Sequence, residues 1–270
     1  MRAGSMMNPS TFPSGRLRIL TSVSALWLWA FPSTHAAYLI LKKDERRIEC
    51  SSVRLNANND YVAETSSGSQ TYPASLVARA EADKPVGFEE AITLAKSGDI
   101  ASAISALKKI ARKNRGLGWD DKANASMAGL FIRQKKYPEA VNALESMRRE
   151  ALSQPDIEGM YWKALLESGE FDTLSAQLDH AIKWGERSSA ARAQILRGDM
   201  KMKKRQLEPA ALDYLRTVAL FEAEKDVQPE ALYKAGLVLE ELHHKKSKDM
   251  FERLIKEYPE SDYARRARHR

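Results

Sequence analysis

The sequence contains a single cysteine, Cys50, so no disulfide can form within the chain. Glycine and proline are also scarce, with 13 and 10 residues among 270. This scarcity excludes collagen-like and linker-like chains, which are rich in those two residues. Hydrophobic residues make up 43% of the sequence, so the protein can bury a sizeable core without covalent cross-links.

Motifs for enzymatic chemistry or metal binding are missing as well. The sequence has no phosphate-binding loop, no dinucleotide-binding glycine motif, no HExxH and no closely spaced cysteine pair. His243 and His244 are neighbours, but adjacent side chains on a helix point about 100° apart and do not share a ligand easily. Acidic residues lie among lysines, as on solvated helix faces. We therefore expect no enzymatic activity, no metal site and no cofactor.

Acidic residues are also missing from residues 1–36, which contain three arginines. Arg16 and Arg18 precede an apolar run over residues 19–31, and small residues follow up to Ala36. This order is typical of a secretory signal peptide. The run is shorter than the roughly 20 residues of a membrane-spanning helix. We expect cleavage near Ala36 and export to the periplasm or cell envelope.

The net charge of +7 falls to +4 when residues 1–36 are set aside. In the remainder, Lys and Arg alternate with Glu and Asp, whereas nucleic-acid-binding proteins cluster their cations on one face. We therefore expect no nucleic-acid partner. Residues 263–270 form a basic tail, which we interpret as a solvated, frayed terminus.

Residues 37–82 are expected to form a small antiparallel β module. Short runs rich in β-forming residues alternate with turns of Asn, Asp, Gly and Ser, as at residues 56–60 and 66–69. This rhythm favours a small sheet or barrel over a helix. It resembles the strand order of SH3-like and Sm-like barrels. A module this short is only marginally stable alone, so we expect it to pack on the helices or on a partner.

From residue 86 the pattern changes to a helical period with an internal repeat. Equivalent positions of the second helix in each repeat lie 37, 34, 36 and 37 residues apart. Four of the five repeats also carry a small residue twelve positions earlier, which lets two helices approach closely. Each two-helix unit cannot bury its apolar face alone, so the units must stack. The five positions are Ala103, Ala140, Leu174, Ala210 and Ser247.

The repeat length and small residues resemble tetratricopeptide repeat (TPR) proteins. The resemblance covers residues 86–262 and is clearest in the last repeat, which ends in Tyr258-Pro259. That ending is similar to repeats of periplasmic envelope proteins such as BamD and CpoB. The resemblance implies a mainly α fold, a right-handed TPR superhelix of about five helical hairpins preceded by the β module. Trp162 and Leu174 depart from the pattern, and their bulk must separate or repack the third hairpin.

A TPR-type superhelix implies a protein-protein interaction scaffold that binds a peptide or partner protein in its concave groove. We expect a role in envelope assembly or maintenance. The alternative is a structural envelope protein that contacts peptidoglycan or anionic lipid through its basic tail or β module. The oligomeric state stays open. The resemblance places five residues in the groove, namely Arg133, Lys163, Asp199, Met202 and Lys203.

The string Leu117-Gly118-Trp119-Asp120 is the most distinctive short motif. Gly118 is expected to end the preceding helix, and Asp120 to cap the next one. Trp119 would then pack between two repeats. A role as a binding anchor is the alternative, because exposed aromatic residues favour interfaces. A structural role is favoured, because a Trp at such a turn usually buries its ring.

Overall fold

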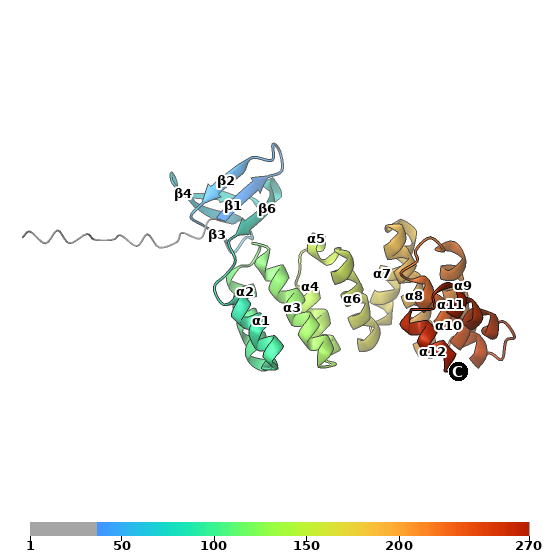
Figure 1. Cartoon of the computed structure of the whole chain (residues 1–270). Coiled ribbons are helices and arrows are strands. Elements are labelled where there is room, and N and C mark those ends of the chain that lie inside the picture. Colours follow the sequence, from blue (N-terminus) through green and yellow to red (C-terminus); the bar gives the residue numbers. More distant parts are fainter. Residues whose placement is uncertain (1–36, 270) are drawn as a thin grey trace, which may run out of the picture. The chain divides into compact units, whose positions relative to one another are not determined.

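The computed structural model describes residues 37–269, and the predicted signal peptide lies outside them. The described part of the chain starts with two three-stranded antiparallel sheets, with strand orders β2-β1-β6 and β3-β4-β5 (Figure 1). A short 3-10 helix precedes the last strand. The elements are β1 (Ala37–Leu41), β2 (Arg47–Cys50), β3 (Ser52–Leu55), β4 (Tyr61–Thr65), β5 (Gly68–Tyr72), the 3-10 helix (Ala74–Leu76) and β6 (Val77–Ala82).

The chain passes almost directly from the first sheet to the second, because β2 and β3 are nearly continuous. Only Ser51 separates β2 from β3, and its backbone N–H donates to the carbonyl oxygen of Glu64 at 2.8 Å. Because side chains alternate along each strand, one face of both sheets is apolar and closes a small core. Leu39 and Ala63 are fully buried in it. Cys50 is buried there too, and this burial raises the pKa of its thiol.

Twelve helices follow within the described residues, so the protein is mainly helical as predicted. They are α1 (Phe88–Ser97), α2 (Ile100–Lys113), α3 (Trp119–Arg133), α4 (Tyr137–Glu145), α5 (Arg149–Leu152), α6 (Pro155–Ser168), α7 (Phe171–Trp184), α8 (Arg187–Lys203), α9 (Leu207–Leu220), α10 (Gln228–Glu241), α11 (Ser247–Glu257) and α12 (Asp262–Arg268). None of the helices in residues 37–269 combines the length and apolar character that crossing a bilayer requires.

Ten of these helices form five hairpins: α1–α2, α3–α4, α6–α7, α8–α9 and α10–α11. The predicted small residues lie where the two helices of a hairpin meet, and Ala103, Ala140 and Ala210 are fully buried. The third hairpin is the exception that the sequence indicated. Trp162 and Leu174 are buried at the equivalent positions, and α6 and α7 lie close together over a shorter stretch than the other pairs.

Each hairpin turns through one residue in the left-handed conformation. This residue is Gly in the first and third hairpins and Lys135, Arg205 or His243 in the others. In the second to fifth hairpins, the backbone N–H of the next residue donates a hydrogen bond to the carbonyl oxygen five residues earlier, as from Lys136 to Phe131, and this bond ends the first helix. His243 and His244 lie in this turn, so their expected placement on a helix is wrong.

The last helix corrects the interpretation of residues 263–270 as a frayed tail. Residues 262–268 form α12, which packs against α10 and α11. The Ser261 side chain accepts a hydrogen bond from the backbone N–H of Ala264 at 3.0 Å and caps the helix. Ala264 and Ala267 are buried. The β module and all the helices lie in one compact unit over residues 35–270, and the predicted domain boundaries stay a prediction.

Candidate functional site

The first helices of successive hairpins share one side of the stack, which we call the A-face. Along it, α3 packs against α6, and α6 packs against α8. Each of the second helices α2, α4, α7 and α9 lies between two first helices and makes its main contacts with them. The A-face is therefore the side on which the sequence places partner binding.

Three of the five predicted groove residues are exposed on the A-face. Arg133 ends α3, Lys163 lies in α6, and Lys203 ends α8. The Lys203 ammonium pairs with the Glu167 carboxylate of α6 at 3.0 Å, so it links two hairpins. Within residues 37–269, neither Arg133 nor Lys163 has an ion-pair or hydrogen-bond partner for its side chain, which leaves both cations available.

The other two predicted residues serve the internal structure. Asp199 accepts hydrogen bonds from the Tyr214 hydroxyl at 2.7 Å and the Lys234 ammonium at 2.6 Å. Burial raises the pKa of Asp199, although Lys234 opposes the shift. Met202 packs partly buried against the core of the last two hairpins. Partner binding by any of the five residues stays a prediction.

A hollow of about 310 Å³ lies between α1 and α3 on the A-face. Ile92 and Leu130 give it an apolar lining, and the cations Lys96 and Arg133 flank it. Gly129 also lines it, and a methyl group at this glycine would meet no atom within 4 Å. A glycine inside a helix costs about 1 kcal/mol relative to alanine. Sequence reasoning missed Lys96 and Gly129, although an unexplained glycine within a predicted helix was a readable signal.

Trp119 joins the β module to the helices. Its indole N–H donates to the carbonyl oxygen of Ala82 in β6 at 2.8 Å, and its ring meets Phe88 edge-on at 5.1 Å. The contacts show the favoured structural role: the ring belongs to α3 of the second hairpin and packs against α1 of the first, as predicted, and its N–H also binds β6. The roles of the flanking residues were wrong. Gly118 precedes α3 as its N-cap, and Asp120 accepts from the backbone N–H of Gly116.

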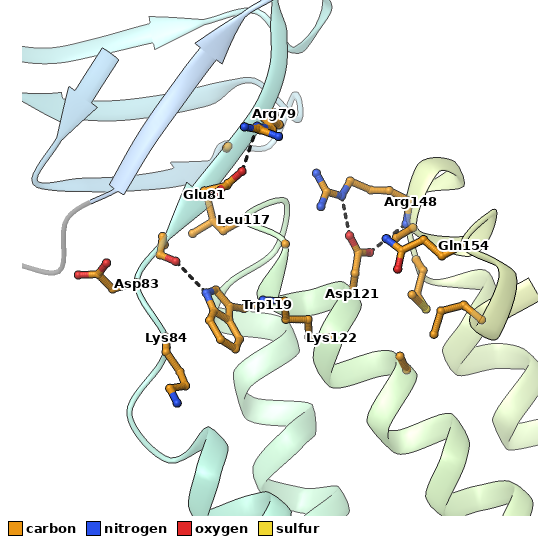
Figure 2. Close-up of a pocket in the computed structure, with 17 residues that line it drawn as sticks. Arg79, Glu81, Asp83, Lys84, Leu117, Trp119, Asp121, Lys122, Arg148 and Gln154 are labelled. Atoms are coloured by element: carbon orange, nitrogen blue, oxygen red, sulfur yellow. Dashed lines mark hydrogen bonds and ion pairs between the residues drawn. The ribbon is translucent and has the colours of Figure 1, made fainter. Parts of the chain in front are cut away.

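A cavity of about 600 Å³ opens beside Trp119, between β6, α3 and the start of α6 (Figure 2). Its apolar lining includes Leu117, Met147 and Ile157. Most of its charged groups are already paired. The Asp121 carboxylate accepts from the Arg148 guanidinium at 2.7 Å and from the Arg148 backbone N–H at 3.0 Å (Figure 2). Because most of the charged side chains that line this cavity already have partners, the cavity offers a ligand apolar contacts and few unpaired charges.

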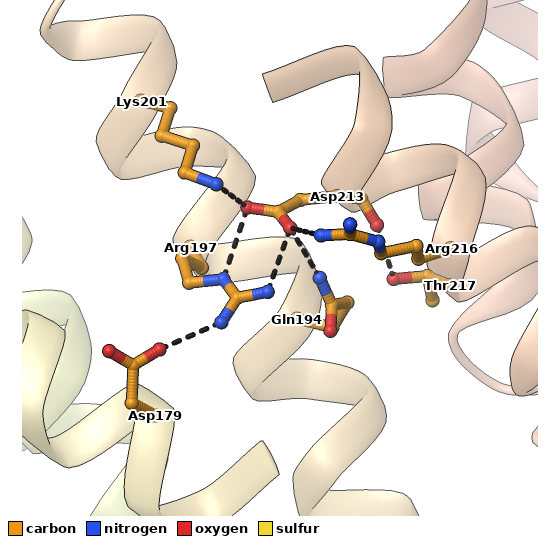
Figure 3. Close-up of polar contacts among 7 residues, drawn as sticks. All are labelled: Asp179, Gln194, Arg197, Lys201, Asp213, Arg216 and Thr217. Atoms are coloured by element: carbon orange, nitrogen blue, oxygen red, sulfur yellow. Dashed lines mark hydrogen bonds and ion pairs between the residues drawn. The ribbon is translucent and has the colours of Figure 1, made fainter. Parts of the chain in front are cut away.

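A second polar cluster joins α8 and α9 around Asp213, which is fully buried (Figure 3). Its carboxylate accepts from Arg197 at 2.9 Å and from Lys201 at 2.6 Å. Burial acts to raise the pKa of Asp213, but the hydrogen bonds from these two cations outweigh it and lower the pKa. Gln194 and Arg216 also donate to the same carboxylate, and Arg197 extends the cluster to Asp179 of α7. This cluster is structural, because its central group is inaccessible.

The last hairpin is closely packed. Leu232 and Leu254 are fully buried between α10 and α11, and Gly236 lies directly against the Phe251 ring. Residues 230–261 match the tetratricopeptide repeat family. The match covers nearly all of α10 and all of α11, so the last hairpin is similar to a TPR unit, and the other four hairpins precede it with the same alternation of helices.

Other comparisons add little to the TPR match. The chain is similar to the crystal structure of YrrB, described as a TPR protein with an unusual peptide-binding site, at 17% sequence identity and a TM-score of 0.45. That similarity covers 69% of this chain and 93% of YrrB. It is too distant to bear on function. No curated protein matches the sequence. Within residues 37–269, no group of His, Cys, Asp and Glu side chains could hold a metal ion.

Proposed function

We propose that this protein is a non-enzymatic scaffold that binds a peptide or partner protein on the A-face of its hairpins. The observation that carries the proposal is the pair of exposed cations, Arg133 and Lys163, which have no partner among residues 37–269. Nearby charges such as Lys203 and Asp199 are paired within the fold. The TPR match of the last hairpin supports a role in protein interaction, since stacked helical repeats typically present an extended binding surface.

The compartment is part of the same proposal. An exported scaffold in the cell envelope would lose residues 1–36, and the strand β1 begins at Ala37. Ala37 pairs in register with Ala82 of β6, so a cut after Ala36 would leave the sheet intact. Amino-terminal sequencing of the protein from its native cell should find Ala37 as the first residue. Retention of residues 1–36 would contradict export by cleavage.

The β module is proposed to be a small SH3-like barrel. The continuous bent path of β2 and β3 between the two sheets and the 3-10 helix before the last strand both support this. Its contacts with Gly116 and Trp119 fit the expectation that so small a module needs support.

Recovery of partners from envelope extracts tests the scaffold function. The double variant R133E/K163E reverses both exposed cations on the A-face. The control K109E/R112E makes the same charge change at exposed positions of α2, away from the A-face. We expect the first variant to lose its crosslinked partners and the control to retain them. Equal recovery by both variants would remove the A-face assignment.

A further inference from the structure

The hairpin turns follow two different local rules within one chain. In the first and third hairpins the left-handed residue is Gly98 or Gly169, the residue type that this conformation favours. In the other three it is Lys135 (φ 58°), Arg205 (φ 58°) or His243 (φ 53°). A side chain in the left-handed region costs roughly 1 kcal/mol or more relative to glycine. The first and third hairpins show that this fold accepts glycine there.

Two of the same three turns also place a cation before a helix start, while the residue before α9 is the neutral Gln206. In the first hairpin, Asp99 precedes α2 and its carboxylate accepts from the backbone N–H of Ser102 at 3.1 Å. The residue that precedes α4 is Lys136, and the one that precedes α11 is Lys246, and neither side chain caps its helix. Positive charge at a helix N-terminus opposes the helix dipole. Each of the three turns thus carries a cation at one or both of these unfavourable positions, namely Lys135 and Lys136, Arg205, and Lys246.

Two of these turns lie side by side and form a cationic edge. The Arg205 guanidinium lies 3.9 Å from the Glu241 carboxylate at the end of α10, which brings the α8–α9 turn next to the α10–α11 turn. The Arg205 side chain is 87% exposed, so this contact is loose. We define the cationic edge as the exposed residues Lys204, Arg205, His243, His244, Lys245 and Lys246.

The composition of the edge favours one kind of partner. Its side chains are long and polar and project from turns, and none of the large exposed apolar residues of the described chain belongs to it. A peptide partner would need a buried apolar anchor to bind with useful affinity. Binding to a negatively charged membrane surface needs no apolar anchor. Clustered cations are enough, because each Lys or Arg near the lipid contributes about 1 kcal/mol of electrostatic attraction.

We propose that the cationic edge binds the surface of an anionic lipid bilayer. Contact would run through the turns of the fourth and fifth hairpins and leave Arg133 and Lys163 of the A-face uncovered for a protein partner. The local cost of Arg205 in the left-handed conformation is then the cost of presenting its charge at the tip of the turn. The proposal goes beyond the scaffold function and does not depend on it.

Sedimentation with lipid vesicles tests the proposal on the full chain. Wild-type protein should bind vesicles of equimolar phosphatidylglycerol and phosphatidylcholine, bind pure phosphatidylcholine far less, and dissociate in high salt. The variant R205Q/K245Q/K246Q should bind at least about tenfold more weakly, since it removes three cations from the edge. The control K109Q/R112Q/K113Q removes three exposed cations from α2 and should bind within about twofold of wild type.

Three results would overturn the proposal: no preference for phosphatidylglycerol, equal loss in both variants, or binding to soluble polyphosphate without binding to vesicles. The last result would assign the edge to an acidic polymer. A further variant, R205G, removes one cation together with its backbone strain. It should bind vesicles more weakly while its thermal midpoint rises, and a drop in the midpoint would contradict the strain argument. Partner recovery through Arg133 and Lys163 should be unchanged in all these variants, which separates this test from that of the scaffold function.

Discussion

Trp119 makes both an apolar and a polar contact between the β module and the helices. Its ring packs against Phe88, and its N–H satisfies the Ala82 carbonyl at the end of β6. The Lys122 ammonium lies 4.1 Å from the ring centroid and adds a cation–π contact. The sequence predicted that the ring is structural. It could not predict the neighbour, because the β module and α3 meet only through contacts between residues far apart in the chain.

Substitution of Trp119 separates the two contributions. Trp119→Phe keeps an aromatic ring beside Phe88 but removes the N–H, so the free energy of unfolding should fall by about 1 kcal/mol. Trp119→Ala should cost more, about 2 kcal/mol, because it also removes the half-buried ring. Urea unfolding of the two variants measures both values. Equal losses would show that the ring adds nothing beyond the hydrogen bond, and a Trp119→Phe variant as stable as wild type would show that the hydrogen bond to Ala82 contributes nothing.

Gly198 and Gly129 both lie inside helices, but they differ in the space available for a side chain. A methyl group at Gly198 would overlap the Tyr214 ring, whereas one at Gly129 would meet open space. We expect Gly198→Ala to lower the free energy of unfolding by roughly 1–3 kcal/mol through overpacking. Gly129→Ala should raise it by up to about 1 kcal/mol through helix propensity. Thermal unfolding checks both signs, and a stabilised Gly198→Ala protein would contradict the close approach of α8 and α9.

At the scale of helices, the Asp213 cluster ties α8 to α9 and reaches α7 through Arg197 (Figure 3). Sequence periodicity predicts which helices pair, because the spacing of small residues records it. It does not predict which polar side chains meet across the pair. The hydrogen bonds of Asp199 with Tyr214 and Lys234, which lie on neighbouring helices, are an example.

Asp213→Asn tests the cluster through its dependence on pH. The folded protein holds the pKa of Asp213 below its ordinary value, so the carboxylate stabilises the fold at neutral pH and this contribution disappears as the pH falls through the lowered pKa. We expect the variant to lose about 3 kcal/mol near neutral pH, because Arg197 and Lys201 lose their buried counter-ion.

The difference between wild type and Asp213→Asn should shrink well below the ordinary carboxyl pKa of about 4. Urea unfolding at several pH values measures it. A difference that stays constant with pH would mean that the lost stability comes from packing, with no contribution from the charge.

At the scale of the whole molecule, the five stacked hairpins and the β module before them were predictable, and the helix that ends the stack was not. Equivalent positions recur every 34 to 37 residues because each hairpin must present the same apolar faces to its neighbours. The terminal helix α12 breaks that repeat and carries three arginines, so its sequence favoured a solvated tail. Burial of Ala264 and Ala267 against the last hairpin gives it the role of a cap.

Removal of residues 262–270 tests this role. The deletion would expose apolar surface of α10 and α11, including the face of Tyr233 that Tyr263 covers at 5.5 Å. End caps with a polar outer face keep repeat proteins soluble. We expect a lower thermal midpoint and concentration-dependent association in light scattering. A truncated protein with unchanged stability and solubility would restore the interpretation of these residues as a frayed tail.

The buried thiol of Cys50 gives this chain an intrinsic reporter. Because it is the single cysteine of the sequence and lies inside the β module, a thiol-labelling reagent can modify the protein only when that module opens. The labelling rate therefore measures how often the β module opens while the helices remain folded. If its contacts with α3 hold the module closed, labelling should be slow in the intact protein and fast once Trp119 is replaced by alanine.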